Sequence, residues 1–110
     1  MSGISKIAIP FRGKFDCEVS GFLYEANDPR DLGQDMVEVR LPIGIHINAG
    51  WYPEGDVDGT YVVTVHGAAN IPSSERATAS EAAQVIADLV AFFAKQSDEA
   101  IHTPSPLAPG

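Results

Sequence analysis

The sequence has very little cysteine, and this excludes one class of small protein. Cys17 is the single cysteine in 110 residues, so no disulfide can form within the chain and a disulfide-stapled secreted fold is excluded. The sequence also lacks a basic leader followed by an apolar run, and it lacks an apolar run long enough to cross a bilayer. We therefore expect a cytoplasmic protein with no membrane segment.

Positive charge is also scarce. Seven Lys and Arg residues oppose fifteen Asp and Glu residues, which gives a formal net charge of −8. All of the acids lie from Asp16 onward, where the basic residues are only Arg30, Arg40, Arg76 and Lys95. A surface of this sign repels phosphate backbones, so we do not expect nucleic-acid binding.

Catalytic motifs are missing as well. The sequence contains no phosphate-binding glycine loop, no Cys-x-x-Cys pair and no recognisable Ser, His and acid constellation. Cys17 shares its parity with Phe15 and Val19, which places it in the core, where a thiol is usually inert. These absences favour a protein that is not an enzyme without excluding one, and we expect no cofactor.

What the sequence does contain is a long alternating stretch from Met36 to Asn48. Apolar residues occupy its odd positions and mostly polar residues its even positions, the pattern of a strand with one buried face. We interpret it as one strand that bends or bulges at Pro42 and Gly44. At about 3.3 Å per residue, an unbroken strand would separate Glu38 from His46 by about 26 Å.

Three further stretches are typical of strands. Residues 4–11 and 15–21 predict a hairpin with Ile7 opposite Val19 and a bulge at Gly21. Thr60 to His66 is rich in β-branched residues and should pair antiparallel with the long strand. Together these stretches predict a four-stranded antiparallel sheet in meander order.

A helical period replaces the strand period from Thr78 to Gln96. Thr78 and Glu81 form a capping-box pattern. The apolar stripe of the helix comprises Ala82, Ile86, Leu89, Val90 and Phe93. We predict an α+β fold, a two-layer sandwich with this C-terminal helix on one face of the sheet, with residues 1–96 as one domain and residues 97–110 as a disordered Pro-rich tail.

Two polar connections complete the chain. In residues 26–35, Asp28 can cap a helical turn that begins at Pro29. In residues 50–59, the run from Glu54 to Gly59 matches the opening of a calcium-binding EF-hand loop. Position twelve of that motif would be Val65 instead of a bidentate Glu, so we predict a turn and no metal site.

The candidate binding residues fall into three pairs. Trp51 and Tyr52 stand at a loop edge, and Val85 and Phe92 lie on a shoulder of the helix outside its apolar stripe. His46 and His66 share the helix-free face, but two imidazoles alone do not make a zinc site.

Two hypotheses of function remain open. The first is a small acidic protein-interaction module that self-associates as a homodimer or docks on a basic protein partner. Its binding acids would be Asp28, Asp31, Asp35, Glu54, Asp56 and Asp58. The alternative is a small ligand-binding protein or enzyme with a pocket near the Trp51 and Tyr52 loop, with His46 and His66 nearby.

Overall fold

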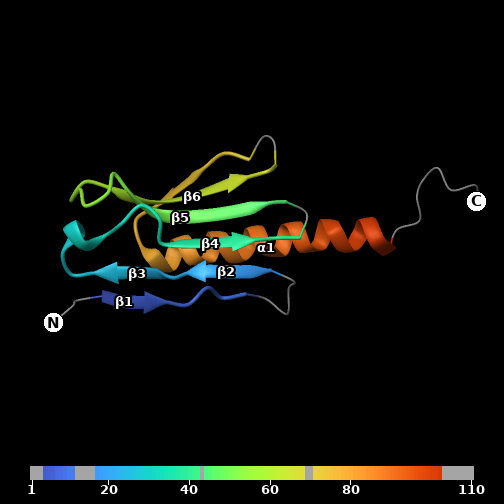
Figure 1. The fold of residues 1–110 in the computed structure, drawn as a ribbon, viewed down its shortest axis with the longest axis horizontal. Helices are drawn as coiled ribbons and strands as arrows, with labels where there is room; N and C mark the ends of the chain where they lie inside the picture. Colours follow the sequence, from blue (N-terminus) through green and yellow to red (C-terminus); the bar gives the residue numbers. More distant parts are fainter. Residues whose placement is uncertain (1–3, 12–16, 43, 69–70, 103–110) are drawn as a thin grey trace, which may run out of the picture.

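The computed structural model describes residues 4–11, 17–42, 44–68 and 71–102, the last seven of these without their side chains. Figure 1 shows the order of the elements along the chain. The elements are β1 (Ile4–Ile7), β2 (Glu18–Gly21), β3 (Leu23–Ala26), the short 3₁₀ helix η1 (Pro29–Asp31), β4 (Val37–Arg40), β5 (His46–Tyr52), β6 (Thr60–His66), β7 (Ser74–Arg76) and α1 (Ala79–His102).

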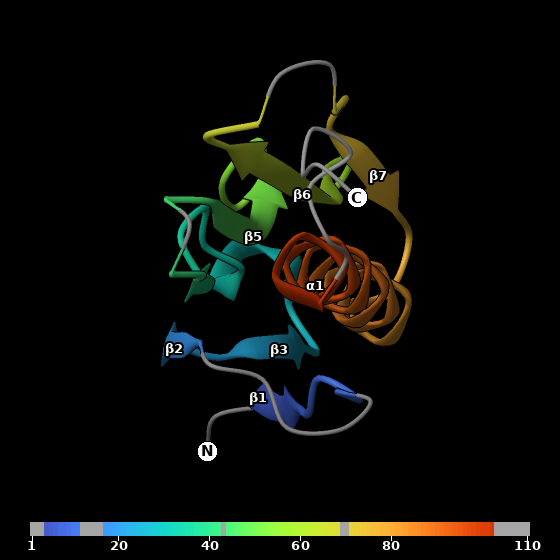
Figure 2. The same cartoon turned by 90° about the vertical axis from the view of Figure 1, so that its right-hand side faces the viewer.

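The strands form two antiparallel sheets instead of the predicted single sheet of four strands. One sheet has the order β2-β4-β5-β6-β7, and β1 and β3 form a separate two-stranded sheet. Figure 2 shows that the strands curve around one side of α1 and leave the opposite face of the five-stranded sheet without a helix. The α+β class and the C-terminal helix are confirmed, whereas the four-stranded meander is corrected.

The long strand predicted from Met36 to Asn48 is in fact a hairpin. Its two arms are β4 and β5, with Val37 opposite Ala49 and Val39 opposite Ile47. Gly44 has a φ of +80°, a conformation that glycine adopts without steric cost, and its amide donates to the Leu41 carbonyl at 3.2 Å. The register pairs odd residues with odd residues, so the apolar face stays continuous through the turn.

The N-terminal strands also pair differently from the prediction. Ile7 lies opposite Leu23, not opposite Val19, and β2 pairs instead with β4. The chain changes partner at Phe22, directly after Gly21, whose φ is +76°. The predicted irregularity at Gly21 is therefore present as a break between two strands, while the predicted hairpin loop at residues 12–14 lies outside the described residues.

A third difference is the strand β7, which was not among the predicted strands. Ser74 lies opposite Val63, and Arg76 lies opposite Tyr61. Three residues are too few to give a recognisable period, so the sequence pattern does not reveal this edge strand. It extends the sheet beyond β6 and leads directly into α1.

The helix begins with the predicted capping box. The Glu81 amide donates to Thr78 Oγ1 at 3.1 Å, and the Thr78 hydroxyl donates to the Glu81 carboxylate at 3.0 Å. The helix continues to His102, past the predicted end at Gln96. Residues 103–110 of the predicted tail lie outside the described residues.

The core lies between α1 and the odd-numbered face of the strands. Ala82, Ile86, Val90 and Phe93 of the predicted stripe are buried, and Leu89 is half-buried against them. The other core side chains come from the strands and from the alanines of the helix, and include Leu23, Val39, Ile47, Val63, Ala79, Ala83 and Ala87.

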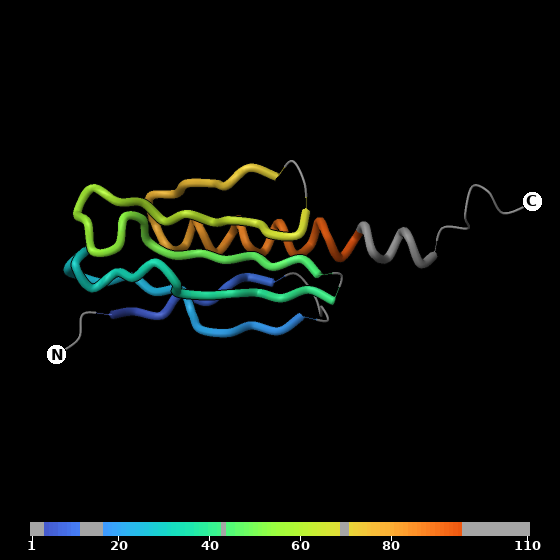
Figure 3. Tube along the Cα trace, turned by 45° about the horizontal axis from the view of Figure 1, so that its top comes forward, coloured from blue at the N-terminus to red at the C-terminus, as the bar shows by residue number. Residues whose placement is uncertain are grey.

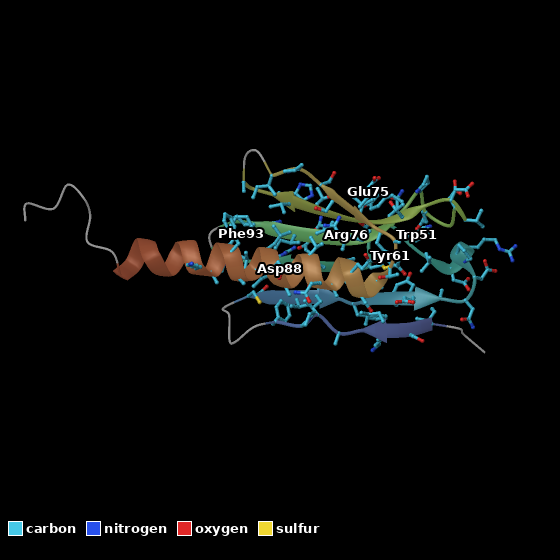
Figure 4. The ribbon with its side chains drawn as sticks, turned by 180° about the vertical axis from the view of Figure 1, so that it is seen from behind. Trp51, Tyr61, Glu75, Arg76, Asp88 and Phe93 are labelled. Atoms are coloured by element: carbon cyan, nitrogen blue, oxygen red, sulfur yellow. The ribbon has the colours of Figure 1, made fainter. Side chains whose placement is uncertain are left out.

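Two aromatic residues form the part of the core nearest the β5–β6 loop. The rings of Trp51 and Tyr61 meet edge to face, with centroids 5.0 Å apart, a favourable arrangement of two aromatic quadrupoles. The Tyr61 hydroxyl donates to the Tyr24 carbonyl at 2.8 Å and so joins β6 to β3. Figure 4 shows this pair well separated along the sheet from Phe93.

Candidate functional site

The helix-free face of the five-stranded sheet carries rows of polar side chains. Arg40 lies opposite His46 on β5, and His46 lies opposite His66 on β6. The next row joins Ser20, Glu38, Asn48 and Thr64 across four strands. Figure 1 looks onto this face, with α1 behind it.

The hairpin brings Glu38 close to the histidines and overturns the distance expected from a single strand. Glu38 pairs with Asn48, one row away from His46. A hydrogen bond from Arg40, and then the positive potential of Arg40, His46 and His66, hold the pKa of the Glu38 carboxyl below its usual value. The error arose because alternation gives the facing of residues but not the point at which a strand turns back.

Glu38 also lines an open pocket on this face. Its volume is about 270 Å³, and its walls are formed by Ser20, Gly21, Asp35, Met36, Val37, Glu38 and Asn48. The pocket lies at the end of β2, beside Gly21 and Met36. At this point the Phe22 amide donates to the Met36 carbonyl at 2.9 Å. Small-molecule sites usually have volumes of about 300 to 1,000 Å³, so this pocket lies near the lower end of that range.

Asn48 has an unusual position in the wall of the pocket. It is a central residue of β5, the middle strand of the sheet, and its Oδ1 atom is buried with no hydrogen-bond partner among the described residues. Leaving a buried acceptor unsatisfied typically costs about 1 to 3 kcal/mol. An acceptor left unsatisfied at the centre of a sheet makes Asn48 a candidate for a functional contact.

Two acidic loops meet at the end of the molecule next to this pocket. The Gly55 amide donates to the Leu32 carbonyl at 2.9 Å, and the Trp51 amide donates to the Gly33 carbonyl at 2.8 Å. Figure 3 shows η1 and the β5–β6 loop at the same end. We call this region the acidic end; its carboxylates are those of Asp28, Asp31, Asp35, Glu54, Asp56 and Asp58.

The local cation is already engaged in this region. Arg30 donates from Nη2 to Asp28 Oδ2 at 2.7 Å, and its backbone amide donates to Asp28 Oδ1 at 3.0 Å, the predicted cap of η1. Arg30 holds the pKa of the Asp28 carboxyl below its usual value, chiefly through the side-chain hydrogen bond. Arg30 also attracts Asp31 more weakly, but it is the only cation of the two loops and its ion pair is with Asp28.

Trp51, predicted at a loop edge, lies in the core. It is only 8% exposed, and its Nε1 donates to the Asp56 carbonyl at 2.8 Å. Its role is to close the core beneath the β5–β6 loop. Tyr52 is 36% exposed. The partial burial of its phenol, followed by the negative charge of Asp35, raises the pKa of this group.

The two residues predicted on the helix shoulder differ in exposure. Phe92 is 49% exposed and meets Phe93 edge to face, with centroids 5.2 Å apart. Val85 is half-buried against the core. Self-association through this shoulder stays a prediction.

The histidines and the EF-hand-like loop do not join a larger set of ligands. In the part of the chain that the structure describes, no group of three or more His, Cys, Asp or Glu residues could hold a metal ion. In the loop, Asp56 Oδ1 accepts the Asp58 amide at 2.8 Å, and the Asp56 carbonyl accepts the Gly59 amide at 3.0 Å. The run from Glu54 to Gly59 is therefore a turn, as predicted.

Sequence reasoning missed Asn48 and the pocket that it lines. The available signal was an amide between Ile47 and Ala49, in the middle of an apolar strand. The pocket itself could not be inferred, because Ser20, Asp35 and Asn48 meet only through the pairing of β2 with β4 and of β4 with β5.

No known family model, curated protein or solved structure matches this chain. Within the described residues, no helix is both long enough and apolar enough to span a bilayer. Functional inference therefore depends on the geometry and charge of the chain itself.

Proposed function

We propose that this protein is a small interaction module that docks on a positively charged protein partner through its acidic end. The observation that carries the proposal is the junction of two acidic loops, residues 28–35 and 53–58, which are separated by β4 and β5 in the sequence. Backbone hydrogen bonds from Gly55 and Trp51 hold the loops side by side.

The fixed geometry of the loops supports binding. The Tyr24 hydroxyl accepts the Gly33 amide at 3.1 Å and donates to the Asp31 carbonyl at 3.2 Å. A rigid set of like charges focuses negative potential and increases the rate at which a basic partner associates. Loops whose backbone is held in place in this way lose little backbone freedom on binding.

The alternative of a small-ligand site beside Trp51 has less support. Trp51 is buried and bonded to the loop backbone, so its ring is not available to a ligand. The open pocket lies instead between β2, β4 and β5, and its volume is about 270 Å³.

A charge-neutralised pair of variants tests the proposal. The probe is a twelve-residue peptide of alternating lysine and glycine, followed by titration calorimetry at low and moderate salt. The double variant Glu54→Gln/Asp58→Asn changes two acids of the acidic end whose side chains accept none of the hydrogen bonds described above. We expect it to weaken peptide binding about tenfold at low salt, since each exposed charge contributes up to about 1 kcal/mol.

The control is Glu18→Gln/Asp88→Asn, which makes the same change in net charge on β2 and α1. It should weaken binding by less than about threefold, because these residues lie away from the acidic end. Equal losses in the two double variants would show that only net charge attracts the peptide, and the proposed docking surface would be wrong.

A further inference from the structure

The pocket beside the acidic end is lined by two carboxylates and two neutral polar side chains. Asp35 belongs both to the acidic end and to the pocket wall, so the two features form one continuous surface. The pocket also presents the carboxylate of Glu38, the amide of Asn48 and the hydroxyl of Ser20. A carboxylate accepts hydrogen bonds and cannot donate them while ionised.

Two of the oxygen atoms in the pocket residues have no hydrogen-bond partner among the described residues. Arg40 bonds to Oε1 of Glu38, and no hydrogen bond to Oε2 is found among the described residues. Asn48 Oδ1 is buried without a partner. Asn48 itself lines the pocket, and the terminal torsion of its side chain is soft.

Two described cations lie near the pocket, and each already has a contact. Lys6 Nζ lies over the Phe22 ring, 4.5 Å from its centroid, and Arg40 is paired with Glu38. In the part of the chain that the structure describes, no cation forms an ion pair with Asp35. Asp35 is exposed and the Glu38 side chain is 31% exposed, so the donors of a partner can reach both carboxylates.

We propose that this pocket receives an arginine side chain of the partner protein. Arginine fits because its planar guanidinium carries five N–H donors and no acceptor. Its donors suit the carboxylates of Asp35 and Glu38 and the side-chain oxygen of Asn48, which all line the pocket. The inference depends on the proposed docking function and names the residue type that anchors the partner.

The experiment uses three capped tripeptides, Gly-Arg-Gly, Gly-citrulline-Gly and Gly-Lys-Gly, titrated into the whole chain and followed by amide chemical shifts. Citrulline keeps the shape of arginine but removes its charge. The arginine peptide should bind saturably, with the largest shifts at Gly21, Val37 and Asn48. The citrulline peptide should bind at least tenfold more weakly, and the lysine peptide several-fold more weakly.

Variants of the whole chain locate the site. Asp35→Asn and Asn48→Val should each weaken arginine-peptide binding at least fivefold, whereas Asp58→Asn, which removes a charge outside the pocket, should change it less than twofold. Asn48→Val should also unfold at the same or a higher urea concentration than the original chain, because it removes an unsatisfied buried acceptor. That measurement distinguishes loss of the binding contact from loss of the fold.

Several results would overturn the pocket assignment. If the citrulline peptide bound as tightly as the arginine peptide, the charge of the guanidinium would not contribute to binding. If the lysine peptide bound as tightly or more tightly, the assignment of the pocket to arginine would be wrong. Equal losses for Asp35→Asn and Asp58→Asn, or no binding of the arginine peptide, would refute the pocket itself. If the Glu54→Gln/Asp58→Asn variant still lost affinity for the long lysine peptide, the proposed docking function would stand without it.

Discussion

Gly21 lies where the chain passes from one sheet to the other, and it meets two separate constraints. Its φ is +76°, and a Cβ built on it would lie 2.2 Å from the Met36 carbonyl oxygen. Gly44 has a similar φ of +80°, but a Cβ built there would meet nothing within 4 Å. Substitutions at Gly21 and Gly44 therefore distinguish the cost of a left-handed backbone conformation from the cost of a steric clash.

We expect Gly21→Ala to destabilise the protein by at least about 2 kcal/mol more than Gly44→Ala. Gly44→Ala should cost about 1 to 2 kcal/mol, the usual penalty for a side chain in the left-handed region. Urea unfolding followed by circular dichroism measures both free energies. Equal losses would show that Met36 moves away from a new Cβ without cost.

Tyr61 links pH to stability on the alkaline side. Burial, followed by the negative charge of Glu25, raises the pKa of its phenol to about 12 from a usual value of 10.0. The folded state therefore holds this proton more tightly than the unfolded state, so the stabilisation is complete below pH 10 and is lost as the pH rises toward about 12.

The test is to compare unfolding of the original chain and of Tyr61→Phe across that pH range. The variant should be less stable at neutral pH, because it loses the hydrogen bond to the Tyr24 carbonyl. The difference between the two proteins should shrink as the pH approaches about 12. A difference that stays constant would mean that Tyr61 does not titrate in this range.

At the scale of the element, α1 supplies the apolar surface that covers the sheet. Ile86 is fully buried, and Leu89, on the same stripe, is only half-buried. We expect Ile86→Ala to cost about 2 to 5 kcal/mol and Leu89→Ala to cost less. Thermal and urea unfolding measure both; a larger loss at Leu89 would contradict the orientation of the helix.

The sequence was informative about which face of each element is buried, and less so about how the elements connect. Val37, Val39, Ile45 and Ile47 all point into the core as predicted, because burial produces the alternation directly. The same alternation fits one long strand or a hairpin whose register pairs odd residues with odd residues. Pro42 and Gly44 were interpreted as a bend, although their chemistry equally suits a turn.

The candidate site was less predictable for the same reason. Glu38 and His46 are eight residues apart along an extended chain, and only the hairpin places them in adjacent rows. The acidic loops were recognised by composition, but their contact depends on backbone hydrogen bonds from Gly55 and Trp51. Backbone groups are the same at every residue, so no sequence pattern marks these bonds.

At the scale of the whole molecule, Phe92 tests whether the chain self-associates. Its ring is 49% exposed, so Phe92→Asp should keep the fold and change the free energy of unfolding by less than about 1 kcal/mol. Sedimentation velocity of the original chain and the variant then reports mass. If the original chain is a dimer and the helix shoulder is its interface, the variant should be a monomer.

A dimer that persists in Phe92→Asp would place the interface elsewhere. Unfolding of the variant would show that Phe92 contributes to the core more than its exposure suggests. Val85→Ala is the companion variant, and it should have a larger effect on stability because Val85 is half-buried against the core.

The change of partner at Phe22 divides the molecule into parts that can open separately. β3 pairs with β1 alone, and β2 pairs with β4, so β1 can detach without breaking a hydrogen bond of the five-stranded sheet. Amide hydrogens that are protected only by the β1–β3 pairing would then exchange with solvent through a local opening. Those of Ile47 and Val63, in the central strands, would exchange only when the whole molecule unfolds.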